Sequence, residues 1–121
     1  MWYQKSGNKY HAKSSIYNGV YYASQLEAAY AMELDVRLKA KDIKSWRRQV
    51  KIPLDVNGFH ICNYYIDFEI THKDGSLEFV ETKGMETDLW RFKWKLTEAL
   101  FSKERPDVKL TVVKKNQMRF R

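Results

Sequence analysis

The sequence predicts an α/β protein in which a central mixed sheet is flanked by helices and preceded by a short hairpin. Two stretches repeat apolar residues at helical spacing, and β-forming runs separated by Gly-containing turns lie between them. The predicted order is helix, three antiparallel strands, helix, strand. Because the second and third strands are apolar on both faces, we expect helices on both sides of the sheet.

The first predicted elements are a hairpin and a helix. Asn18-Gly19 lies between β-forming residues, which favours a two-residue turn with positive φ at both positions. Ser24 is a typical N-cap, and the helix that it starts should run to about Ala40. The residues expected on its buried side are Leu26, Ala29, Tyr30, Leu34 and Leu38.

Three strands are then predicted over residues 46–54, 59–71 and 77–83, with Asn57-Gly58 as the first turn. The turn at 73–75 decides the register of the last two. A two-residue loop would place Asp67 and Glu81 on opposite faces of the sheet. A three-residue loop with Gly75 in the left-handed region pairs His72 with Ser76 and sets Asp67 directly opposite Glu81, and we predict this loop.

The last predicted elements are a helix and a strand. Thr87 or Asp88 caps the helix, which should end near Lys103. Residues 108–113 form the strand, and a basic tail follows over 114–121. The expected buried stripe of the helix consists of Leu89, Phe92, Leu96, Ala99 and Leu100.

Composition narrows the classes of protein and partner. The 121 residues, 44% hydrophobic and without a linker, indicate a single domain over 1–121, with a basic hairpin over 5–22. The formal net charge of +7 equals the number of bases that lie before Glu27 or after Val113, so the positive charge is concentrated at the two ends. These ends suit binding to a polyanion such as nucleic acid, or they merely favour solubility. The single cysteine, Cys62, excludes a disulfide framework and Cys-based zinc sites. We expect a cytoplasmic protein that does not enter a membrane.

Three ionisable residues stand within core-like strands: Asp67, Glu81 and Lys83. The predicted register brings them to one place, where two carboxylates would repel each other unless a cation lay between them. An oxygen-lined pocket of this kind suits Mg²⁺, with Mn²⁺ as a substitute, and an adjacent lysine can hold a water. These parts fit phosphodiester hydrolysis. The alternative is a structural Asp67–Lys83 ion pair with Glu81 solvated.

Asp67 followed by Glu81-Thr82-Lys83 on the next strand resembles the D…E-x-K signature of the PD-(D/E)XK, or restriction-endonuclease-like, nuclease superfamily. Residues 7–115 are similar to small phage-encoded endonucleases and Holliday-junction-resolvase-like members, in which a hairpin ending in Ser-x-x-Glu precedes those strands. Ser24 and Glu27 match that motif, whereas Ile66 replaces the proline of the signature.

The resemblance implies a restriction-endonuclease-like core and a role for each matching residue. Asp67, Glu81 and the main-chain carbonyl of Thr82 would hold the metal, Lys83 would serve the attacking water, and Glu27 would add a carboxylate. Glu27 has a competing interpretation, because Ser-x-x-Glu at a helix start is also a capping box. Gln49 could reach the edge of the site, or could simply lie on an exposed strand face.

Cations mixed with aromatic residues indicate where DNA would bind. Trp90 and Trp94 could stack on bases, or pack on the N-terminal hairpin or a second subunit. The expected DNA contacts are Arg47, Arg48, Arg91, Lys93, Lys95, Lys114 and Lys115.

The sequence therefore predicts a Mg²⁺-dependent endodeoxyribonuclease, phage-derived and selective for branched or junction DNA, with a homodimer possible. The alternatives are a site-directed, homing-type endonuclease of the same fold and a nucleic-acid-binding module that does not cleave.

Overall fold

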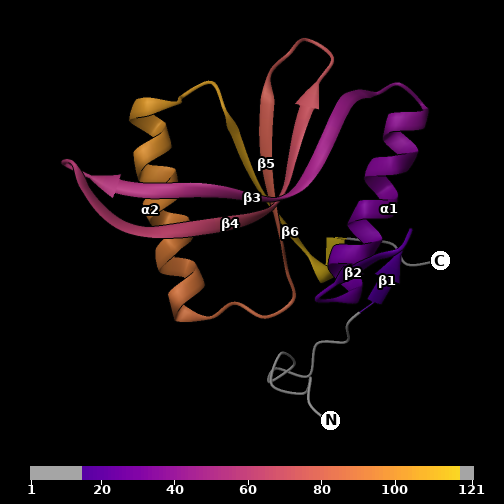
Figure 1. The fold of residues 1–121 in the computed structure, drawn as a ribbon, viewed down its shortest axis with the longest axis horizontal. Coiled ribbons are helices and arrows are strands. Elements are labelled where there is room, and N and C mark those ends of the chain that lie inside the picture. The colour runs from indigo at the N-terminus through magenta and orange to yellow at the C-terminus, as the bar shows by residue number, and fades with distance from the viewer. Residues whose placement is uncertain (1–14, 118–121) are drawn as a thin grey trace.

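The computed structural model describes residues 15–117, which form two helices, a four-stranded mixed sheet and an N-terminal hairpin (Figure 1). The predicted α/β class and element order are confirmed at this level. Residues 5–14 of the expected basic hairpin and 118–121 of the basic tail lie outside the described part. The elements are β1 (Ser15–Tyr17), β2 (Val20–Tyr22), α1 (Gln25–Lys39), β3 (Ile43–Val56), β4 (Phe59–His72), β5 (Leu77–Lys83), α2 (Asp88–Glu104), β6 (Lys109–Lys114) and a 3₁₀ turn (Lys115–Gln117).

The four-stranded sheet has the order β3-β4-β5-β6. Neighbours β3, β4 and β5 are antiparallel, whereas β6 runs parallel to β5 and is reached through α2, as a parallel pairing requires. Strand β5 has the predicted bounds, and β3 begins earlier than predicted, at Ile43. Each helix covers a different part of the sheet (Figure 1).

The predicted turns are confirmed by their backbone angles. Asn18 and Gly19 have φ of 52° and 77°, and Asn57 and Gly58 have φ of 52° and 82°. In both hairpins the two turn residues thus take the positive φ that the Asn-Gly dipeptide favours. The start of α1 is also as predicted, because the Ser24 Oγ accepts a hydrogen bond of 3.1 Å from the Glu27 N–H.

The β4–β5 register is the predicted one. Gly75 has φ of 89°, its N–H donates to the His72 carbonyl, and the His72 N–H donates to the Ser76 carbonyl at 2.8 Å. The paired residues run from Thr71, which lies opposite Leu77, to Phe68, which lies opposite Val80. The next pair along the strands is therefore Asp67 and Glu81, and the three-residue loop sets them opposite each other.

Strand β4 packs against α2 before Asp67 and against α1 after it. Phe68 belongs to a core cluster with α1, whereas Ile66, which has the same side-chain parity, belongs to a cluster with α2. Figure 1 shows β3 and β4 crossing from beside α1 to beside α2. Opposite Asp67 on β3, Gln49 has a φ of 54°, an uncommon value for a residue with a side chain. The strands bend at this point, and the candidate residues lie around the bend.

The two predicted helix faces are correct only in part. In α1 the predicted Leu26, Tyr30 and Leu34 are buried, whereas Ala29 is half-buried and Leu38 is exposed; the helix also buries Glu27, Ala28 and Ala31. In α2 the predicted Leu96 and Leu100 are half-buried against the core, whereas Ala99 is exposed and Leu89 and Phe92 are 64% and 60% exposed. The residues that α2 buries are Trp90, Trp94, Thr97 and Phe101. Within the described residues, no helix is long and apolar enough to cross a membrane.

Candidate active site

The structure brings together the four residues that the signature singles out. Asp67 lies on β4, Glu81 and Lys83 on β5, and Glu27 in the first turn of α1. The Asp67 N–H donates to Glu81 Oε1 at 2.8 Å, and Lys83 Nζ lies 3.9 Å from Glu81 Oε2. The charge of Asp67 raises the pKa of both Glu27 and Glu81, which places it beside both.

Asp67 is held through one of its two carboxylate oxygens. Its Oδ2 accepts hydrogen bonds from the Thr82 N–H at 2.9 Å and from Thr82 Oγ1 at 2.8 Å. Burial raises the pKa of Asp67, and the Thr82 donors and the charges of Lys83 and Arg48 oppose that rise. No described residue donates a hydrogen bond to Oδ1, so this oxygen can take a further ligand.

Glu81 is almost fully buried, at 2% exposure. Its Oε2 accepts hydrogen bonds from the Tyr64 hydroxyl at 2.6 Å and from Trp90 Nε1 at 2.9 Å. Desolvation and the charge of Asp67 raise its pKa to about 7, although the Tyr64 donor lowers it. The structural alternative of a solvated Glu81 beside an Asp67–Lys83 ion pair is therefore wrong.

Glu27 is also buried, at 5% exposure, and its carboxylate contacts Gln49 and Arg48 of β3. Oε2 accepts a hydrogen bond of 3.2 Å from Gln49 Nε2 and lies 3.7 Å from the Arg48 guanidinium. Burial and the charge of Asp67 raise the pKa of Glu27 to about 7. Ser24 caps the helix, but no hydrogen bond joins the Glu27 carboxylate to the Ser24 N–H, so only half of a capping box is formed.

The buried Glu27 and Glu81 and the half-buried Asp67, all with raised pKa values, lie around the bend, which is the electrostatic setting that a cation relieves. Among residues 15–117, no three His, Cys, Asp or Glu side chains are arranged to enclose a metal ion. Mg²⁺ does not need such a set, because it usually keeps several waters and binds through one or two carboxylates. Asp67 Oδ1 and a second lone pair on Glu81 Oε1 fit that requirement.

Sequence reasoning missed Tyr64 and misread Trp90. Trp90 Nε1 donates to both the Tyr64 hydroxyl, at 2.7 Å, and Glu81, so the two aromatic residues hold the carboxylate together. Trp94 stacks on Trp90 and meets the Tyr64 ring edge-on, so neither tryptophan is placed for base stacking or on the hairpin. Tyr64 lies two residues before Ile66, so its side chain is on the same, buried face of the strand. Because a buried tyrosine hydroxyl needs a hydrogen-bond partner, the sequence could have indicated its role.

The expected DNA contacts are dispersed. Arg48 lies at the site, whereas Arg47 pairs with Glu69, its Nε 2.6 Å from Oε1. Arg91 and Lys114 both pair with Glu86, at 3.3 Å and 2.8 Å. The other three lie on α2 and after β6, where Lys93 is half-buried and Lys95 and Lys115 are exposed.

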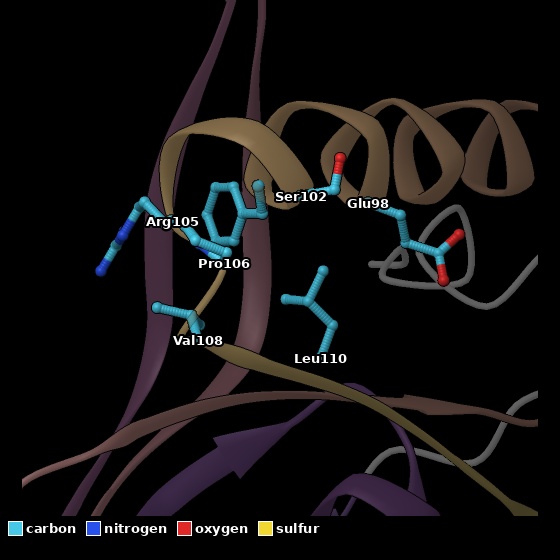
Figure 2. Close-up of a pocket in the computed structure, with 7 residues that line it drawn as sticks. Glu98, Ser102, Arg105, Pro106, Val108 and Leu110 are labelled. Carbon is cyan, nitrogen blue, oxygen red and sulfur yellow. The ribbon is translucent and has the colours of Figure 1, made fainter.

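A pocket of about 180 Å³ lies elsewhere, between the C-terminal half of α2 and β6 (Figure 2). None of the four candidate residues lines it. Its lining residues are Glu98, Phe101, Ser102, Arg105, Pro106, Val108 and Leu110.

A family model described as "Protein of unknown function (DUF1064)" matches residues 7–119, and the chain therefore belongs to that family. No curated protein and no solved structure matches the chain.

Proposed function

We propose that this member of the DUF1064 family is a Mg²⁺-dependent endodeoxyribonuclease with a restriction-endonuclease-like core. The observation that carries the proposal is the position of Asp67 beside two buried carboxylates, each with a pKa of about 7, and one strand away from Lys83. Strongly perturbed carboxylates that converge at a bend in the sheet are typical of a functional site.

Asp67 and Glu81 would hold the ion, with the Thr82 main-chain carbonyl as a third protein ligand, and Mn²⁺ could substitute for Mg²⁺. The ion would polarise the phosphate and supply a bound water as nucleophile. Thr82 supports this arrangement, because its N–H and hydroxyl fix one oxygen of Asp67 and leave the other open. Tyr64 and Trp90 fix Glu81 in the same way.

Lys83 is suited to handle the attacking water. Its side chain is 25% exposed, so Nζ can reach both solvent and the buried carboxylates. The Trp90 ring lies under Nζ, with 5.1 Å between Nζ and the ring centroid, which restricts where the amine can point. Glu27 is close enough to Asp67 for the two charges to interact, and it would add negative charge near the ligands or accept a proton from a second water.

We propose DNA as the substrate and favour branched or junction DNA over an extended base sequence. The surface cations can contact phosphates of any sequence, which favours recognition of the shape of the DNA. A homing-type endonuclease is the nearest alternative within the same chemistry, and a homodimer would allow it to read a longer site.

Cleavage assays test the proposal. The purified protein is incubated with supercoiled, linear and four-way-junction DNA in Mg²⁺, Mn²⁺ or EDTA. We expect cleavage only with a metal ion, and we expect Asp67→Asn and Lys83→Ala to lower the rate by about 100-fold or more. Full activity in Asp67→Asn would reject the site, and salt-dependent binding without cleavage in any metal would favour the non-cleaving module.

The same assay separates the two roles of Glu27. Glu27→Gln keeps the Ser24 cap, because Ser24 Oγ bonds to the Glu27 backbone N–H, but it removes the carboxylate charge. We expect slower cleavage at unchanged helix content. Ser24→Ala should instead destabilise the fold by about 1 kcal/mol and retain cleavage below the unfolding temperature. Glu33→Gln, on the exposed side of α1, is the charge-matched control.

A further inference from the structure

Arg48 on β3 is held in place without being well bonded. Its guanidinium lies over the Tyr22 ring, 4.6 Å from the centroid, and one terminal nitrogen is 3.4 Å from the Tyr21 carbonyl and 3.7 Å from Glu27 Oε2. Both distances exceed the 2.7–2.9 Å typical of charge-assisted hydrogen bonds. Arg48 Nε is buried and has no hydrogen-bond partner. It is the only such buried side-chain nitrogen or oxygen among the described residues.

The neighbouring Arg47, in contrast, has a hydrogen-bond acceptor for its Nε. Its Nε donates to Glu69 Oε1 at 2.6 Å, although its side chain is 68% exposed. Arg48 is the less exposed of the two, at 34%, and has the poorer contacts. A buried donor without an acceptor costs free energy, so a native structure normally provides one from protein, water or a ligand.

The guanidinium that carries the unsatisfied donor lies at the candidate site, with one terminal nitrogen 3.7 Å from Glu27 Oε2. The charge of Arg48 lowers the pKa of both Glu27 and Asp67, so the guanidinium acts electrostatically on both carboxylates. Hairpin β1–β2 supplies the Tyr22 ring and the Tyr21 carbonyl that orient it. The planar fork of an arginine matches the oxygens of a phosphate, and the loose Glu27 contact can be exchanged without the loss of a short hydrogen bond.

We infer that Arg48 is a substrate-binding residue that takes a phosphodiester oxygen of the DNA beside Asp67. The inference rests on the proposed function and deepens it. In this role the N-terminal hairpin builds part of the active site: Tyr22 of β2 lies under the guanidinium, while β3 positions Arg48 one residue before Gln49. The phosphate group would satisfy Nε and a terminal nitrogen at once.

DNA binding without cleavage tests the inference. The full-length protein is titrated with a fluorescein-labelled four-way junction and a duplex in Ca²⁺, over a series of salt concentrations. For Arg48→Gln we expect about tenfold weaker binding and a salt slope that is smaller by about 1, as for the loss of one phosphate contact. Arg48→Lys should keep the slope but lose part of the affinity, because lysine lacks the fork.

Lys44→Gln is the matched control, because Lys44 is an exposed base on the same strand and the charge change is identical. We expect it to bind within twofold of the wild type. Circular dichroism and thermal unfolding establish that each variant is folded. Equal losses in Arg48→Gln and Lys44→Gln, or no loss in either, would overturn the inference. If such a result came with Mg²⁺-dependent cleavage, the nuclease proposal would stand, whereas a wild type that neither binds nor cleaves would overturn both.

Discussion

Glu81 is the residue on which most of the site's hydrogen bonds meet. One oxygen takes the Tyr64 hydroxyl and the Trp90 indole, and the other takes the Asp67 main-chain N–H. Three donors favour the ionised carboxylate, whereas its burial and the nearby Asp67 favour the protonated one. The balance leaves its pKa at about 7, so Tyr64 and Trp90 act on the site by keeping Glu81 oriented and available as an anion.

Tyr64→Phe is predicted to weaken the site without reshaping the core. The substitution removes one donor to Glu81 and leaves the ring against Trp94, so the pKa of Glu81 should rise further. We expect half-maximal cleavage to need about 10-fold more Mg²⁺ and the pH–rate profile to move to higher pH. Tyr65→Phe is the control, because Tyr65 is 53% exposed. An unchanged metal requirement in Tyr64→Phe would contradict the role of this hydroxyl.

At the level of elements, the tight turn at Gly75 sets the geometry of the site. The φ of 89° at Gly75 closes a three-residue loop, and every pair along β4 and β5 then follows from it. A one-residue slip would send the side chains of one strand to the opposite face. Asp67 would then no longer meet the face that carries Glu81 and Lys83.

Gly75→Ala is therefore predicted to destabilise the protein, because a side chain at this φ is strained even though nothing lies within 4 Å of the added Cβ. We expect the free energy of unfolding to fall by about 1–2 kcal/mol in chemical denaturation. Gly84→Ala is the matched control, since Gly84 also has open space and its φ is not positive. A loss in Gly84→Ala as large as that in Gly75→Ala would show that strain at the turn is not the cause.

Rules for short sequence segments predicted the turns and the β4–β5 register. They failed for α2, where packing against the rest of the protein decides which of two apolar helix faces is buried. Helix α2 carries an apolar stripe through Leu89 and Phe92 and another through Trp90 and Trp94. The second is buried because its larger rings fill the space against Tyr64, and because Trp90 finds an acceptor in Glu81. The sequence of the helix does not indicate that a buried acceptor lies opposite Trp90.

The bend at Gln49 was equally inaccessible to sequence reasoning. The residues on both sides of Gln49 alternate as in an ordinary strand, and glutamine gives no hint of a positive φ. Because of the bend, the β3–β4 pair packs against both helices, with Phe68 on the α1 side and Ile66 on the α2 side. The sequence was sufficient to predict that Asp67 lies opposite Glu81. The position of Glu27 beside them depends on the bend, because Glu27 lies on α1 and the bend is where β4 begins to pack on that helix.

At the scale of the molecule, the candidate site lies where β3 and β4 bend and β5 ends. Both helices begin at the end where β5 terminates (Figure 1), and Lys83 of β5 pairs with Lys114 of β6 there. Helix N-termini carry partial positive charge, which favours an approaching phosphate. Arg91 and Lys114 lie close by and pair with Glu86 on the surface, where such pairs are weak enough to exchange for phosphate contacts.

The pKa values of Glu27 and Glu81, both raised to about 7, make a prediction for the whole fold. Glu27 and Glu81 titrate near pH 7 when folded and at about 4.5 when unfolded. Their contribution to stability is thus fully present below pH 4.5 and is lost as the pH rises through 7. The lowered pKa values of Asp74 and Glu86 act only at more acidic pH. In EDTA, we expect the unfolding temperature to fall by several degrees between pH 5.5 and pH 8.

A bound divalent cation should reverse this loss, because it favours the same carboxylates in their ionised form. Calorimetry with and without about 10 to 20 equivalents of Mg²⁺ should show a larger rise in unfolding temperature at pH 8 than at pH 5.5. In Glu81→Gln both the pH dependence and the Mg²⁺ effect should shrink, because the variant lacks one of the two titrating groups and one proposed ligand. If Mg²⁺ stabilised wild type and Glu81→Gln equally at pH 8, the ion would bind elsewhere, and the carboxylates at the bend would have to act without it.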